Sequence, residues 1–83
     1  MSWLQFKLMT LEEFRSEITY RTASTGEKYY SCPMCKTGGP VKGLRERYAR
    51  AFGVTKSSLD FIDDVELIYR SCVETARQSG IIK

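Results

Sequence analysis

The sequence predicts a small α+β domain that is mostly helical, with three helices and short strands in one domain spanning residues 1–83. Three observations lead to this prediction. Hydrophobic residues make up 42% of the 83 residues, which is enough apolar surface for one globular core. Three stretches place apolar side chains at helical spacing, with residues nearby that can cap or stop a helix. Residues 3–8 and 28–31 have the alternating or aromatic character of strands.

The N-terminal part of the chain is expected to contain a strand, a helix and a second strand. Residues 3–8 alternate apolar and polar side chains, which is the period of a short strand. The Thr10 side chain can cap a helix, and the Glu13 side chain can accept a hydrogen bond from the Thr10 backbone N–H. We therefore expect the first helix over residues 11–21. A polar stretch ends this helix, and residues 28–31 form a strand leading into a C-P-M-C hairpin inserted between the first two helices.

Two further helices are expected in the C-terminal half. Pro40 suits the first turn of the second helix, and Gly53 can end it. Ser57 can cap the third helix with Asp60 as its partner, and Gly80 ends this helix after about 20 residues, or roughly 30 Å. The predicted core consists of apolar residues on the inner faces of the helices: Leu11, Phe14, Ile18, Leu44, Tyr48, Phe52, Leu59, Ile62, Val65 and Tyr69.

The charged residues are unevenly distributed along the chain. Residues 21–56 carry eight bases and two acids, whereas residues 1–20 have a net charge of −1 and residues 57–83 a net charge of −2. A basic segment between acidic ends favours an anionic partner, of which nucleic acid is the usual one. The alternative is that these charges only solvate the outer faces of helices.

The C-P-M-C motif offers two thiols from one tight loop. Residues 29–39 resemble a zinc knuckle, and this resemblance implies that Cys32 and Cys35 bind zinc. Residues 25–35 also resemble the start of a two-cysteine, two-histidine zinc finger, but tyrosine and phenylalanine stand where its histidines are expected. A redox site is disfavoured, because residues 36–40 cannot continue a helix from the motif.

The chain has three cysteines and no histidine, so a tetrahedral zinc ion needs further ligands. Cys72 can supply the third, with a carboxylate or a water molecule as the fourth. Alternatively, two copies of the chain share one metal through two knuckles, as a homodimer. Cys72 lies on the apolar stripe of the third helix, where a lone cysteine is commonly a buried core thiol. A knuckle that is only a turn with reduced thiols therefore remains an alternative.

Residues 47–62 resemble the helix-turn-helix family. Ala49 is the small residue inside the first helix of the pair, Gly53 is the glycine four positions later, and Val54 is the hydrophobic residue after it. Leu59 and Ile62 match the hydrophobic positions of the second helix. The resemblance implies a helix-turn-helix-like pair formed by the second and third helices.

The family resemblance also implies a DNA interface, because the second helix of such a pair lies in the major groove. Its first-turn residues would approach bases, and the basic residues of the helix before it would approach phosphates. The chain departs from this pattern at Asp60, Asp63 and Asp64, whose carboxylates would be repelled by DNA phosphates. The residues assigned in this way are Lys56, Ser57 and Ser58 for bases, and Lys42, Arg45, Arg47 and Arg50 for phosphates.

These observations predict a small non-enzymatic regulator that binds nucleic acid. The alternative is an adaptor or inhibitor, for example a small phage or bacterial regulator, that uses the same surface on a protein partner. An enzyme is disfavoured, because the chain has no histidine, no phosphate-binding glycine loop and no nucleophile elbow. No apolar run approaches about 18 residues, so no membrane span is expected. The odd cysteine count favours a reducing, cytoplasmic location.

Overall fold

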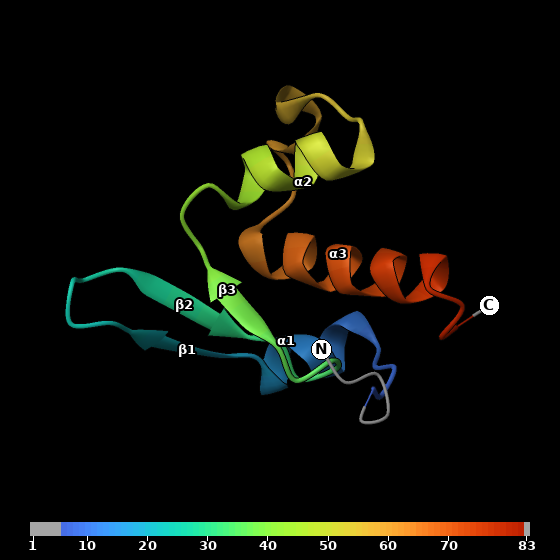
Figure 1. The fold of residues 1–83 in the computed structure, drawn as a ribbon, viewed down its shortest axis with the longest axis horizontal. Helices are drawn as coiled ribbons and strands as arrows, with labels where there is room; N and C mark the ends of the chain where they lie inside the picture. Colours follow the sequence, from blue (N-terminus) through green and yellow to red (C-terminus); the bar gives the residue numbers. More distant parts are fainter. Residues whose placement is uncertain (1–5, 83) are drawn as a thin grey trace.

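The computed structural model describes residues 6–82, which form a small α+β fold of three α-helices and a three-stranded antiparallel sheet. The long helix α3 runs alongside the sheet, and α2 lies on the other side of α3 (Figure 1). This arrangement confirms the predicted small α+β class with three helices, whereas the helix-turn-helix-like pair and the inserted knuckle hairpin stay predictions. The elements follow in the order α1 (Leu11–Glu17), β1 (Thr19–Thr22), β2 (Lys28–Ser31), β3 (Gly38–Pro40), α2 (Leu44–Phe52), the 3-10 helix η2 (Lys56–Leu59) and α3 (Asp64–Gln78).

The first helix begins where the sequence predicts and ends four residues earlier. The Thr10 hydroxyl accepts from the Glu13 backbone N–H at 3.2 Å, and the Glu13 carboxylate accepts from the Thr10 backbone N–H, so the capping box is confirmed. The helix ends at Glu17, because Ile18 adopts an extended conformation with φ −63° and ψ 138°. Residues 19–22 are rich in β-branched and aromatic side chains, and they pair with β2 instead of continuing the helix.

The sheet has the order β1-β2-β3, with the predicted strand over residues 28–31 at its centre. The third strand corrects the prediction that Pro40 opens a helix. Pro40 is paired with Tyr29 and lies on an edge strand, where a residue without an N–H is tolerated. Gly38 makes this strand possible, because a Cβ there would stand 2.2 Å from the Tyr30 carbonyl oxygen.

The helix boundaries in the C-terminal half differ from the predicted ones in two places. The second helix starts at Leu44 and ends, as predicted, before Gly53, whose φ is 66°. The third helix starts at Asp64 and not after Ser57, because Asp63 caps it by accepting from the Glu66 N–H at 2.8 Å. The segment before it forms η2 and a turn, so α3 is 15 residues long instead of about 20.

The core joins α1, the C-P-M-C loop and α3. The rings of Phe14 and Tyr69 meet edge to face at 5.2 Å, and the Tyr69 hydroxyl donates to the Met9 carbonyl at 2.6 Å. Of the ten predicted core residues, Leu11 and Phe52 stay partly exposed outside the buried cluster. Phe14, Leu44 and Leu59 are buried, and Ile18, Tyr48, Ile62, Val65 and Tyr69 pack against the cluster. Besides the three cysteines, the buried residues outside this predicted list are Met9, Met34, Leu67, Ile68 and Ala76, counted among residues 6–82.

The predicted N-terminal strand over residues 3–8 falls partly outside the described residues. Its described part, residues 6–8, is not a strand. The Lys7 N–H instead donates to the Met34 carbonyl at 3.0 Å, which ties this segment to the C-P-M-C loop. Among residues 6–82, no helix has the length and apolar character needed to cross a membrane.

Candidate metal centre

The three cysteines of the chain converge in the interior. Cys32 follows β2, Cys35 lies in the loop before β3, and Cys72 lies in the middle of α3. Their Sγ atoms all lie within 4.8 Å of one another, and all three residues are buried. Together the three thiols could hold a metal ion. The structure thus brings together the residues that the sequence singled out as candidate metal ligands.

The C-P-M-C loop is held closed by its own backbone. The Cys32 N–H donates to the Thr37 carbonyl at 2.7 Å, and the Lys36 N–H donates to the Cys32 carbonyl at 3.0 Å. Lys36 has a φ of 63°, in the left-handed region where residues other than glycine are uncommon. This reversal lets Thr37 return alongside Cys32, and the Thr37 hydroxyl lies 3.0 Å from the Cys35 sulfur.

Helical spacing aims Cys72 at this loop. Ile68 and Ala76, one turn before and one turn after Cys72, are also buried, so the three residues share the inner face of α3. Beside the thiols lies a pocket of about 120 Å³. Hydroxyl-bearing residues make up half of its lining: Tyr30, Thr37, Ser71 and Thr75.

The thiols perturb each other's acidity strongly. Hydrogen bonds from the Cys32 and Cys72 thiols lower the pKa of Cys35, and the Thr37 hydroxyl adds to this effect. The pKa of Cys32 is raised by its hydrogen bond to Cys35, and the pKa of Cys72 is raised by its hydrogen bonds to Cys32 and Cys35. These shifts in pKa make Cys35 the most acidic thiol of the cluster. A cation at its centre would stabilise all three as thiolates.

The spacing fits the geometry of a zinc–thiolate site. With Zn–S distances of about 2.3 Å, tetrahedral coordination puts neighbouring sulfurs roughly 3.8 Å apart. The Sγ–Sγ distances here, all within 4.8 Å, are of a similar size. Within residues 6–82, no carboxylate belongs to the cluster. A fourth ligand would therefore have to be water, a hydroxyl of the adjacent pocket or a group from another molecule.

Three of the basic residues assigned to nucleic acid are engaged within the fold. Arg45 donates to the Asp64 carboxylate at 2.7 Å and also to the Ile62 carbonyl. Arg47 donates to the carbonyls of Lys42 and Pro40 at 2.7 and 2.5 Å.

Lys56 pairs with Glu46 at 2.6 Å. These bonds, from Arg45, Glu46 and Arg47, hold the N-terminal half of α2 to its neighbours, which a sequence pattern of surface bases does not reveal.

The other residues of the assigned DNA interface are exposed and lie on different elements. Lys42 precedes α2 and Arg50 lies within it, whereas Ser57 and Ser58 lie in η2. The Ser58 hydroxyl donates to the Thr55 carbonyl at 2.6 Å. Because η2 ends before α3 begins, these serines do not occupy the first turn of the third helix.

Two of the three acidic residues that seemed to oppose DNA binding, Asp63 and Asp64, form bonds within the fold. Asp63 caps α3 and also accepts from Arg15 at 2.8 Å, which joins α3 to α1. Asp64 is the partner of Arg45. The capping signature of Asp63 with Glu66 is visible in the sequence, but the sequence offers a competing cap at Ser57.

Comparison of the chain with protein-family models, curated proteins and solved structures finds no match. Its function is therefore inferred from the chemistry of its own residues.

Proposed function

We propose that this chain is a small zinc-stabilised regulatory protein that acts by binding nucleic acid and not by catalysis. The observation that carries the proposal is the meeting of Cys32, Cys35 and Cys72 in the interior, from two segments that are far apart in the sequence. Such a site stabilises a fold by joining elements that a small core holds weakly.

Zinc suits this site better than other common ions. Three thiolates are soft ligands, which disfavours magnesium and calcium, and zinc accepts a water molecule or a hydroxyl as its fourth ligand. A zinc ion here would fasten the loop between β2 and β3 to the middle of α3. The C-P-M-C loop would then act as a zinc knuckle whose third ligand comes from a helix.

Nucleic acid is proposed as the partner because the basic segment remains basic after its internal pairs are counted. Arg45 and Lys56 are paired with acids, but Arg21, Lys36, Lys42 and Arg50 have no ion pair among the described residues. Unpaired cations on a small protein attract phosphates. A helix-turn-helix-like use of α2 and α3 is the weaker route, since Arg45 and Arg47 already bond within the fold.

A protein-binding adaptor is the second candidate function, and one residue favours it. Phe61, in the turn between η2 and α3, is 97% exposed. An aromatic side chain this exposed has the size and apolar area of an interface anchor. In this alternative the chain binds a protein partner through the turn and does not need nucleic acid.

A pull-down from the native cell, run with and without nuclease, distinguishes the two functions. Nucleic-acid binding predicts that captured material disappears after nuclease treatment and that Phe61→Ser captures as much as the wild type. The adaptor predicts capture that survives nuclease treatment and is lost in Phe61→Ser. The latter result would overturn the proposed function.

A further inference from the structure

We propose that the outer face of the three-stranded sheet binds single-stranded nucleic acid, with Tyr29 stacking on a base and with Arg21 and Lys36 contacting phosphates. The inference rests on the proposed nucleic-acid function and assigns it a surface and a kind of strand. The surface differs from the basic helix α2 that the sequence pattern singled out.

The strand register decides which side chains share this face. In antiparallel sheets, directly opposed residues lie on the same side. Arg21 is opposite Tyr29, and Thr19 is opposite Ser31. Because side chains alternate along a strand, these four residues share one face and Tyr20 and Tyr30 share the other.

The face that carries Tyr20 and Tyr30 is turned toward the helices. Tyr30 packs against the core and lines the pocket beside the cysteines, and the charges of Asp63 and Asp64 act on Tyr20. The opposite face therefore points away from α3. There Thr19, Arg21 and Ser31 are exposed, and Tyr29 is half-buried.

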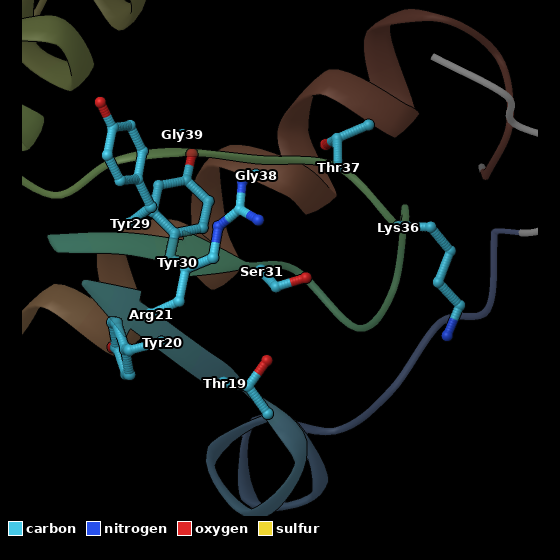
Figure 2. A pocket seen from close by; sticks show the side chains of 10 residues that line it. All are labelled: Thr19, Tyr20, Arg21, Tyr29, Tyr30, Ser31, Lys36, Thr37, Gly38 and Gly39. Atoms are coloured by element: carbon cyan, nitrogen blue, oxygen red, sulfur yellow. The ribbon is translucent and has the colours of Figure 1, made fainter. Parts of the chain in front are cut away.

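This outer face borders an open hollow of about 540 Å³, whose lining also includes Tyr20 and Tyr30 and which Figure 2 shows from close by. Arg21 and Tyr29 lie toward one end of it and Lys36 projects at the other, with the hydroxyls of Thr19 and Ser31 between them (Figure 2). Gly38 and Gly39 add backbone without side chains, so a ligand could approach β3 closely.

The charges around the hollow favour an anion. No aspartate or glutamate lines it, and the side chains of Arg21 and Lys36 form no ion pair within residues 6–82. One acid bonds to a residue of this face, since Glu27 accepts from the Tyr29 hydroxyl at 3.0 Å. That bond holds the hydroxyl end of the Tyr29 ring.

A half-buried ring beside unpaired cations is suited to an unpaired base. A tyrosine ring can stack on any base face, but in a duplex those faces are already covered by neighbouring bases. Arg21 lies near the ring and Lys36 lies at the far end of the hollow, so a strand that crosses the hollow could bring backbone phosphates to both cations. The combination therefore favours single strands over duplex DNA.

The test is fluorescence anisotropy of the zinc-loaded chain with a labelled mixed-sequence oligonucleotide of about 12 nucleotides, as a single strand and as a duplex. Tyr29→Leu removes the ring and Tyr29→Phe keeps it. Arg21→Gln removes one cation. Lys36→Gly removes the other at a left-handed position where glycine is the least strained residue, so misfolding is not expected. Arg50→Gln removes an exposed cation of α2 and tests the competing surface.

We expect the single strand to bind more tightly than the duplex. Tyr29→Leu should weaken binding by roughly 5- to 150-fold, and Tyr29→Phe should leave it nearly unchanged. Arg21→Gln and Lys36→Gly should each reduce the slope of log K against log salt by about 0.7.

The outcomes that contradict the proposal distinguish its two parts, which are nucleic-acid binding and the surface that binds. A preference for duplex, or a salt slope that falls in Arg50→Gln but not in Arg21→Gln and Lys36→Gly, would leave nucleic-acid binding in place and overturn the sheet surface. Binding of neither strand form would overturn the nucleic-acid function together with its surface. An equal loss in Tyr29→Leu and Tyr29→Phe would overturn the assignment of Tyr29 to base stacking.

Discussion

Arg45 of α2 and Asp64 of α3 form an ion pair at 2.7 Å, and the same guanidinium donates to the Ile62 carbonyl. A residue that the basic pattern assigned to phosphate binding thus joins the two helices. The Arg45 side chain is 26% exposed, so water competes only partly for these bonds. Loss of the Arg45 side chain should therefore affect the free energy of unfolding more than nucleic-acid binding.

Arg45→Ala is expected to destabilise the fold by about 1–2 kcal/mol, because charge-assisted bonds to a carboxylate and a carbonyl disappear together. Arg50→Ala, in the same helix but exposed and without an ion pair in the described part of the chain, should change the free energy of unfolding by less than about 0.5 kcal/mol. Urea denaturation of both variants measures the difference. Equal destabilisation would contradict a structural role for Arg45.

Gly38→Ala is expected to destabilise the sheet by about 2 kcal/mol or more. The new Cβ would lie 2.2 Å from the Tyr30 carbonyl oxygen, and a backbone atom in a paired strand cannot easily move aside. Gly39→Ala is the matched control, because its Cβ would lie 3.4 Å from the end of the Tyr30 side chain. Thermal unfolding of the two variants should show the larger loss for Gly38→Ala, and the reverse order would contradict the register of β2 and β3.

Helix ends that depend on neighbouring residues could be predicted from the sequence, whereas those that depend on contacts between distant segments could not. The Thr10 capping box and the stop at Gly53 depend on neighbouring residues and were predicted. The end of α1 at Glu17 was not predicted, because residues 19–22 become a strand only by pairing with β2. The start of α3 was also not predicted, because Ser57 and Asp63 are both residue types that can cap a helix. The contact of Asp63 with Arg15, which the sequence does not show, favours Asp63 as the cap.

The thiols of the candidate metal centre could be predicted from the sequence, but their other neighbours could not. The C-x-x-C spacing and the helical stripe that includes Cys72 both appear in the sequence, and they supplied the three thiols. The hydroxyls of Tyr30, Ser71 and Thr75 could not be foreseen as neighbours, because their position depends on how α3 packs against the sheet. The proposed binding surface on the outer sheet face also depends on long-range pairing, since the hairpin of β1 and β2 puts Arg21 opposite Tyr29.

Asp63 should contribute stability that depends on pH. Its hydrogen bond from Arg15 lowers the pKa of its carboxyl in the folded state. A lowered folded-state pKa means that the stabilisation is present above the unfolded pKa of about 4 and is lost as the pH falls through the folded value.

Asp63→Asn retains a capping side chain but removes this charge. The variant should be less stable than the wild type at pH 7, and the difference should shrink at about pH 2. Thermal unfolding at the two pH values measures this change. A difference that stays constant would show that the ion pair with Arg15 does not contribute.

Removal of zinc should destabilise the chain, because a metal that binds only the folded state adds its binding free energy to folding. Free zinc at about 100 times its dissociation constant adds about 2.7 kcal/mol. For a chain of this size that is roughly 10–20 °C in Tm.

A chelator should therefore lower the Tm of the wild type and of the exposed-site control Gln78→Ala, and it should have little effect on Cys32→Ser. An unchanged wild-type Tm would mean that the three thiols only pack in the core.

The central claim is that Cys32, Cys35 and Cys72 of one chain bind one zinc ion. Native mass spectrometry of the zinc-loaded wild type and of Cys72→Ser tests it most directly, because it gives the mass of each assembly and the number of ions in it. The account predicts one zinc ion per monomer in the wild type and its loss, or a much weaker retention, in Cys72→Ser. One zinc ion per dimer, retained in full by Cys72→Ser, would contradict it and would assign the metal to two knuckles from two chains.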